Sequence, residues 1–137
     1  MLMGWFTKRF GQVRAGRDWH HAILRQARQP EVFARGWVAD TLDGRFHMLT
    51  VVSVLVLRRL RSEGDKGRAL ADRVYRAVFS GIEHALREEG VGDSSIARKM
   101  RKRGEDYFGL ARALDQALTE TEPEVAIAGV LVRNGVT

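Results

Sequence analysis

Apolar positions recur with the spacing of an α-helix along most of the chain. The clearest pattern occupies residues 68–89, where small and apolar side chains repeat every three or four positions and so share one helical face. These positions are Leu70, Val74, Ala77, Val78, Gly81, Ile82 and Ala85. No segment alternates apolar and polar residues as a half-buried strand does, and no hairpin dipeptide joins two such segments. The pattern therefore predicts an all-α protein.

The stretch from about residue 44 to residue 63 is apolar on nearly every side. A run of 12 positions, 46–57, carries most of its apolar residues, and Arg58, Arg59 and Arg61 follow at once. A helix that spans a bilayer needs roughly 20 apolar residues, so this run is too short to cross a membrane. Other helices must therefore cover it. We expect a central core helix over residues 44–63.

Shorter helices are predicted on both sides of these segments. Asp18 can cap a helix that runs to about Gln29, Gly36 can end a short helix, and Thr121 can cap a last apolar helix. A further helix is predicted between them, over residues 94–119. Together the elements predict a single-domain helical bundle of about five to seven helices around the central apolar helix.

The segment from Ser94 to about Thr119 combines an apolar stripe with a dense group of positive charges. The residues of the stripe, which a packed helix would bury, are Ile96, Met100, Tyr107, Ala111, Leu114 and Leu118. Five basic residues lie within six positions and away from the centre of the stripe: Arg98, Lys99, Arg101, Lys102 and Arg103. This arrangement suits an acidic, partly apolar partner. An ordinary solvated helix surface would give the same charge pattern.

The GVGD sequence of residues 90–93 precedes this basic helix. Gly90 suits the position just after a helix end, where glycine often adopts a left-handed conformation, and Asp93 or Ser94 can cap the helix that follows. Asp43 can cap the central helix in the same way. A phosphate-binding loop would instead follow a strand and continue into Gly-Lys-Ser/Thr, which does not occur here. We therefore interpret the stretch as a helix connection.

Composition and charge narrow the class of protein. A chain of 137 residues with 45% hydrophobic and 29% charged residues suits one folded domain and not a disordered chain. The net charge of +6 favours acidic partners such as nucleic acid, anionic lipid or an acidic protein surface. The absence of cysteine excludes disulfides and thiolate chemistry.

The first 17 residues carry a charge of +4, out of a net charge of +6 for the whole chain. Four basic residues occur there without an acidic one: Lys8, Arg9, Arg14 and Arg17. Leu2, Phe6, Phe10 and Val13 recur among them at helical spacing. Such a basic amphipathic helix can lie on an anionic membrane or dock on a partner, although a frayed terminus is an equally good interpretation. Polar residues interrupt the apolar core that a secretory signal needs. We therefore treat residues 1–17 as a basic N-terminal segment and residues 18–137 as one all-α domain.

Neither catalysis nor a bound metal has a clear signal in the sequence. The histidines, at positions 20, 21, 47 and 84, lack the spacing of a zinc motif. Carboxylates such as Asp40 and Asp43 have the spacing of turn and cap residues, and no serine has the features of an activated nucleophile. We expect a protein that is not an enzyme and needs no cofactor, metal or small-molecule substrate.

Two stretches of the chain resemble a known protein family. They are DTLDGRFHMLTVVSVLVLRRLR, residues 40–61, and EGVGDSSIARKMRKRGEDYFGL, residues 89–110. In this order and at this helical separation they are similar to the ubiquinol-cytochrome c chaperone family, and the chain looks like a bacterial-type member. The matching residues are Asp43, Gly44, Arg45 and Phe46 in the first stretch, and Gly90, Val91, Gly92, Asp93, Lys99, Tyr107, Phe108 and Gly109 in the second.

The resemblance implies a non-catalytic, all-α chaperone that holds newly made cytochrome b during assembly of ubiquinol-cytochrome c reductase. It also implies a place near the ribosome exit region and a small partner protein. For a bacterial-type member we expect a cytoplasmic protein with a peripheral contact to an anionic inner membrane.

We divide the candidate site residues into those that contact a partner and those that maintain the structure. The contact candidates are Arg45, Arg58, Arg59, Arg98, Lys99, Arg101, Lys102, Arg103 and Tyr107. The structural candidates are Asp43, Gly44, Phe46, Gly90, Gly92, Asp93 and Gly109. The alternative function is that of a small helical nucleic-acid-binding protein, associated with the ribosome or with RNA through the same basic helix. Aromatic residues do not interleave with the basic run, which disfavours this alternative.

Overall fold

The computed structural model describes the backbone of residues 2–134 and the side chains of residues 14–134. All regular secondary structure in this part of the chain is α-helical. The helices are α1 (Leu2–Ala27), α2 (Pro30–Ala34), α3 (Leu42–Arg61), α4 (Asp65–Glu88), α5 (Asp93–Ala117) and α6 (Pro123–Arg133). The prediction of an all-α domain with five to seven helices is confirmed.

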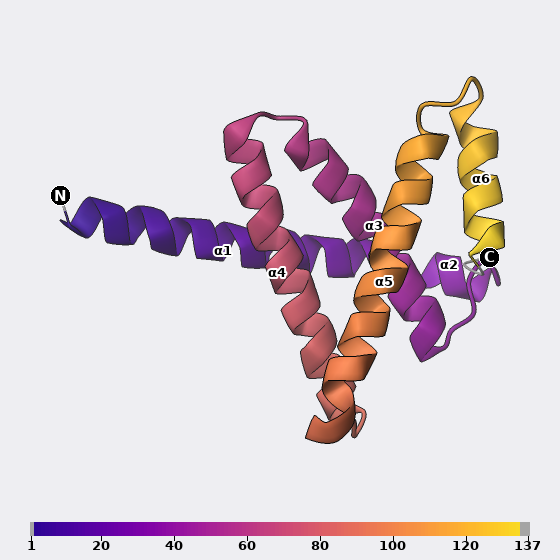
Figure 1. Cartoon of the computed structure of the whole chain (residues 1–137), viewed down its shortest axis with the longest axis horizontal. Helices are drawn as coiled ribbons and strands as arrows, with labels where there is room; N and C mark the ends of the chain where they lie inside the picture. Colours follow the sequence, from indigo (N-terminus) through magenta and orange to yellow (C-terminus); the bar gives the residue numbers. More distant parts are fainter. Residues whose placement is uncertain (1, 135–137) are drawn as a thin grey trace.

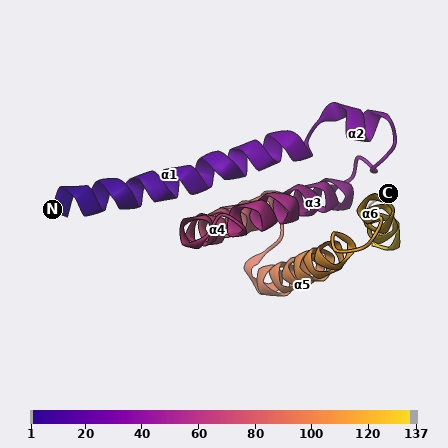
Figure 2. The same ribbon diagram turned by 90° about the horizontal axis from the view of Figure 1, so that it is seen from above.

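The helices form three layers around the hairpin of α3 and α4 (Figures 1 and 2). Helix α1 packs against one side of both hairpin helices, and α5 packs against both on the other side. Helix α6 lies beside α5 and, among the described helices, contacts no other. The N-terminal part of α1 extends beyond the hairpin in both views. The hairpin is therefore covered by α1 on one side and by α5 on the other.

The core is continuous through the layers, and the predicted central helix lies in its middle. Leu57 of α3, Val74 of α4 and Leu114 of α5 are each 0% exposed, and Ile23 of α1 is 1% exposed. Burying an aliphatic side chain of this size contributes roughly 1.5–3 kcal/mol relative to leaving it exposed. Among the described helices, none is both long and apolar enough to cross a bilayer. The expectation that α3 is a core helix is therefore met.

The buried face of α5 is close to the predicted stripe but rotated from it. Ile96, Tyr107 and Leu114 are buried as expected, whereas Met100, Ala111 and Leu118 are only half-buried. Leu110 and Ala117 are buried instead. Because α5 contacts α3, α4 and α6, its buried surface is set by three neighbours and not by one stripe.

Helix α1 corrects the prediction of a helix that begins at Asp18. The backbone is helical without a break from Leu2 to Ala27, so Asp18 lies inside the helix and does not cap it. The side chains of the predicted amphipathic face, Leu2, Phe6, Phe10 and Val13, lie outside those that the structure describes.

The other predicted helix ends are partly right. Gly36 and Gly90 follow the ends of α2 and α4 with φ angles of +73° and +92°, a region that favours glycine. The prediction that Asp43 caps the central helix is wrong, because Thr41 is the N-cap and its hydroxyl accepts a hydrogen bond from the Gly44 amide at 3.0 Å. The cap position of α5 is occupied by Gly92, not by Asp93 or Ser94.

Candidate functional site

The DGRF stretch forms the first turn of α3, and Gly44 fixes how the preceding loop packs. A Cβ added to Gly44 would lie 1.9 Å from the carbonyl oxygen of Ala39 and 3.2 Å from Cγ1 of Val38. No side chain fits at this position, so the loop can lie directly against the helix. The close approach of the loop to the helix therefore depends on glycine at position 44.

Arg103 joins the two motif stretches. Its guanidinium donates a hydrogen bond to the Asp43 carboxylate, with Nη2 and Oδ1 3.0 Å apart, and its Cζ lies 4.2 Å above the ring of Phe46. The Arg103 side chain is only 15% exposed, whereas Asp43 is 74% exposed. A partly desolvated cation over an aromatic ring contributes on the order of 1 kcal/mol. Asp43, Phe46 and Arg103 thus hold α5 against the start of α3.

A large apolar groove opens beside this junction, with a volume of about 1000 Å³. Residues of α1, α2, the beginning of α3 and the end of α4 line it. Its apolar walls include Leu24, Phe33, Leu42, Phe46, Leu49 and Ile82. Charged residues of both signs surround these walls: Arg28, Asp40, Arg45, Glu88, Glu89 and Arg103. We call this feature the apolar groove. Its chemistry suits an apolar segment of another protein, because the walls are apolar and the rim can pair with polar groups.

The basic run on α5 divides into four exposed residues and one packed residue. Arg98, Lys99, Arg101 and Lys102 are exposed. Within the described side chains, Lys102 is the member of this group that forms an ion pair. Its Nζ lies 3.8 Å from Oδ2 of Asp106, which is long for an ion pair. Arg103 is a correction to the prediction, since its charge is directed inward at Asp43 and Phe46 and is not available as a free surface charge. We call Arg98, Lys99, Arg101 and Lys102 the exposed basic run.

The arginines predicted on α3 do not form one surface. Arg45 lines the apolar groove and pairs with Asp40 at 2.8 Å. Arg58 lies 13 residues further along the helix, or about 20 Å at 1.5 Å per residue. There it pairs with Asp115 of α5, and Arg59 pairs with Glu63 at 3.0 Å. Arg58 therefore links two layers of the fold, and Arg45 alone of these three borders the groove.

Tyr107 is a core residue and not a surface contact. Its side chain is 3% exposed, and its ring packs edge-on against Tyr75 and Phe79 with centroid distances of 5.7 and 5.3 Å. Burial raises the pKa of the Tyr107 hydroxyl well above its usual value. The neighbouring Phe108 is 52% exposed and so has more access to a partner. The prediction that Tyr107 contacts a partner directly is corrected accordingly.

The remaining structural candidates have different roles from those predicted. Gly92 and Gly109 are exposed, and a Cβ at either would meet no atom within 4 Å, so packing does not require glycine there. Asp93 does not accept from the backbone as a cap but pairs with Arg87 at 2.5 Å. Asp93 therefore ties the start of α5 to the end of α4.

A second, basic pocket lies where α1 crosses α4. Its volume is about 970 Å³, and none of the described residues that line it is acidic. The basic residues that line it are Arg17, His20, His21, Arg73, Arg76 and His84. Burial, followed by the charges of His21 and Arg28, lowers the pKa of His20. His84 is paired with Glu88 at 3.1 Å, outside the pocket. Within the described region, no three histidine or carboxylate side chains are grouped as metal ligands.

Sequence reasoning missed both the apolar groove and the basic pocket. The arginines at positions 73 and 76 do share one helical face with His84, which is a visible signal. The partners on α1 are more than 50 positions away, and no periodicity along one helix indicates which other helix lies beside it.

Comparison with known proteins decides the family. A family model described as "Ubiquinol-cytochrome C chaperone" matches residues 35–137, which include α3 to α6 and both motif stretches. The chain belongs to the ubiquinol-cytochrome c chaperone family. Among solved structures it is similar to the crystal structure of the Cbp3 homolog from Brucella abortus, at 30% sequence identity and a TM-score of 0.82. The similarity covers 98% of this chain and 74% of that one. No curated protein sequence matches the chain.

Membership in the ubiquinol-cytochrome c chaperone family assigns the protein to the chaperones of ubiquinol-cytochrome c reductase assembly. The match begins at residue 35, so the whole α1 wall of the basic pocket lies outside it, whereas the similarity to the Brucella abortus structure covers 98% of the chain and so extends into α1. The helical layers therefore have a counterpart in a solved relative.

Proposed function

We propose that this chaperone holds newly made cytochrome b and does so without catalysis. The apolar groove is the observation that carries the proposal. A membrane protein exposes apolar helices before it is inserted, and such a helix needs apolar walls with a polar rim. The family match supports cytochrome b as the client.

The geometry of the groove rim supports a helical segment as the part of the client that is held. Leu42 is 47% exposed and lines the groove, so about half of the surface of this apolar residue is open to a partner. Arg45 and Asp40 lie on the same wall and offer both a donor and an acceptor. The exposed basic run ends at Lys102, next to Arg103, which itself lines the groove. The run can attract acidic residues of the client towards the groove.

We expect negative charge in the groove to abolish client binding while leaving the fold intact. The test changes Leu42 and Ala85 to glutamate, since both are exposed and both line the groove. A carboxylate has to be desolvated against an apolar segment, so recovery of cytochrome b should fall at least about tenfold. Recovery is measured by affinity purification from cells that assemble the reductase.

The matched control changes Leu55 and Ala69 to glutamate. These residues also lie on α3 and α4, are exposed, and do not line the groove. This variant should recover cytochrome b as the unchanged protein does. Equal recovery by the groove variant and the control would exclude the groove as the client site, and a failure of the unchanged protein to recover cytochrome b would overturn the proposed client.

We also propose a peripheral contact between α1 and anionic membranes of the cell interior. The basic N-terminal segment and the basic pocket follow one another along α1, because Arg17 belongs to both. Like charges that gather without carboxylates repel one another, and phosphate groups of lipids would neutralise them.

Neutralising the N-terminal charges should weaken binding to vesicles that contain anionic lipid. The variant changes Lys8, Arg9, Arg14 and Arg17 to glutamine and keeps the chain length, because Gly16 packs closely against Arg73 and a deletion would disturb α1. Each basic residue near such a surface contributes about 1 kcal/mol, so binding should fall at least tenfold in a vesicle sedimentation assay. Neutralising the four residues of the exposed basic run removes the same charge from α5. Equal loss in both variants would show that net charge alone controls the binding.

A further inference from the structure

Helix α6 is an apolar helix with support on one side. Among the described helices it contacts only α5, and Val130 is its one buried residue. Val125 and Val132 are 67% and 62% exposed. A helix of this composition normally buries more of its surface, so an additional contact would complete its packing.

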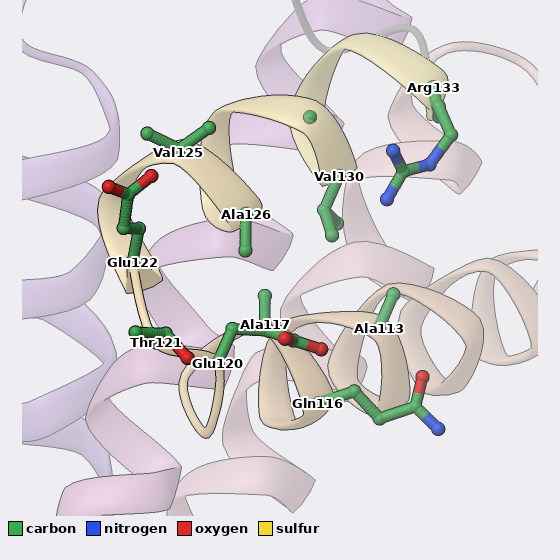
Figure 3. A pocket seen from close by; sticks show the side chains of 11 residues that line it. Ala113, Gln116, Ala117, Glu120, Thr121, Glu122, Val125, Ala126, Val130 and Arg133 are labelled. Carbon is green, nitrogen blue, oxygen red and sulfur yellow. The ribbon is translucent and has the colours of Figure 1, made fainter.

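A groove runs between α6 and the end of α5 (Figure 3). Its volume is about 690 Å³. Small residues of both helices line it: Ala113, Ala117, Ala126 and Gly129. Small residues allow the backbone of another helix to approach closely, because little lies between the two helix axes. We call this feature the α5–α6 groove. It shares no lining residue with the apolar groove.

The two ends of the α5–α6 groove carry opposite charges. Glu122 lies at the beginning of α6 and Arg133 at its end, and both are exposed and line the groove (Figure 3). Within the described side chains, neither forms an ion pair closer than 4.0 Å. They are eleven positions apart, which places them on the same side of the helix, about 16 Å from each other along its axis. An occupant that fits must therefore carry a positive and a negative group at this spacing, in the reverse order.

Helix α6 itself meets that requirement when it is turned end to end. In an antiparallel pair of α6 helices that cross between residues 127 and 128, Glu122 of each copy is opposite Arg133 of the other. The same register places Ala126 of each copy opposite Gly129 of the other, so the smallest side chains meet near the crossing point. One two-fold axis satisfies both relations, which is the condition for a self-complementary interface.

We infer that the α5–α6 groove binds α6 of a second copy of this chain, in antiparallel orientation, to form a two-fold symmetric dimer. The contact is short, since α6 has 11 residues and is about 16 Å long. Stable interfaces bury roughly 1,200–2,000 Å², more than two helices of this length provide. The dimer is therefore weak and forms reversibly at high protein concentration.

Charge exchange across the α5–α6 groove tests the inference. Glu122→Arg and Arg133→Glu, each alone, place like charges opposite one another and should weaken dimerisation at least tenfold in sedimentation equilibrium. A mixture of these two variants should form a heterodimer as strong as the unchanged dimer. In one copy both ends of α6 are then basic, and in the other both ends are acidic. Every pair of residues that face each other therefore joins unlike charges. The double variant should dimerise as well, because its two charges are exchanged and each still faces the opposite sign. Glu124→Arg, an equal change of charge on the other side of α6, should have no such effect.

A steric variant gives an independent readout. The three atoms nearest to a Cβ at Gly129 would all belong to the flexible side chain of Arg133, the closest of them at 3.1 Å, so Gly129→Leu should fold normally. It should nevertheless abolish the dimer, because the larger side chain fills the crossing point. Three outcomes would overturn the inference: an unchanged protein that stays monomeric at millimolar concentration, single charge variants that dimerise normally, or a mixture that fails to associate. None of them bears on whether cytochrome b is bound in the apolar groove.

Discussion

Replacing Gly44 by alanine should unfold the protein or destabilise it severely. The added Cβ would lie 1.9 Å from the carbonyl oxygen and 3.0 Å from the carbonyl carbon of Ala39. Both are backbone atoms, so they cannot rotate aside as the end of a long side chain does. The loop before α3 would have to separate from the helix, and the contact of Arg103 with Asp43 and Phe46 would be disturbed with it.

We expect a loss of at least about 3 kcal/mol in the free energy of unfolding, which is at the upper end for an overpacked site. For a domain of this size that loss lowers the midpoint of thermal unfolding by roughly 10 °C. Circular dichroism during heating measures it. Because a loss of about 3 kcal/mol is a large share of the stability of a typical domain, the variant should also be poorly soluble in cells.

Gly109 provides the matched control. It also lies in a helix and belongs to a matching motif, but it is exposed and a Cβ there would meet no atom within 4 Å. Gly109→Ala should therefore raise the stability, by about 0.5–1 kcal/mol, because alanine loses less backbone entropy on folding. An unchanged melting curve for Gly44→Ala, or an equal loss in both variants, would contradict the close packing of the DGRF stretch.

The helical periodicity was sufficient to predict the fold class because each core helix buries a face that repeats in sequence. Val74, Val78 and Ile82 of α4 are all buried, as their spacing predicts. Gly90 was also predictable, since a residue with φ of +92° at a helix end is nearly always glycine. These features depend on residues close in sequence, and one sequence is enough to show them.

The errors at the helix ends have a common physical cause. Thr41 and Asp43 can both accept a hydrogen bond from a backbone amide, so composition alone does not select the cap. The choice is made by Gly44, whose close packing against Ala39 fixes where the first turn begins. Similarly, Asp18 was a good cap in isolation, but the backbone is helical on both sides of it and the helix continues through it.

The roles of Arg103 and Tyr107 depend on contacts over long sequence distances, which explains why they were misjudged. Arg103 pairs with a residue 60 positions earlier. Tyr107 packs against Tyr75 and Phe79 of another helix. The apolar groove is likewise assembled from residues of several helices, α1 to α4 with Arg103 of α5. Spacing within one helix shows which residues share a face, but it does not show which helix covers that face.

The exposed basic run should be essential for client recognition and nearly irrelevant to stability. We expect this of a variant in which Arg98, Lys99, Arg101 and Lys102 are changed to glutamate and Arg103 is kept, because Arg103 belongs to the junction of α3 and α5. The four side chains are exposed, and such charges contribute at most about 1 kcal/mol each to stability. The variant should therefore fold and accumulate to normal levels.

The matched control reverses the same amount of charge on the opposite layer. Changing Arg14, Arg17, Arg73 and Arg76 to glutamate leaves α5 intact and gives the protein the same net charge as the first variant. If the location of the charge matters, this control should still recover cytochrome b after detergent extraction. If only net charge matters, both variants should lose it equally.

In cells that depend on this chaperone, reversal of the exposed basic run should reduce cytochrome b and the assembled reductase and spare the other respiratory complexes. The physical reason is that four reversed charges beside the apolar groove turn attraction for an acidic client surface into repulsion, which slows capture before any apolar contact forms. Capture measured in purified components should then recover in part at high salt, because screening at about 1 M salt limits the repulsion to about 3 Å. If these residues instead contact the client through the apolar parts of their side chains, high salt should not restore capture by the variant. Normal capture by the reversed variant at low salt would remove the exposed basic run from the client surface and leave recognition to the groove.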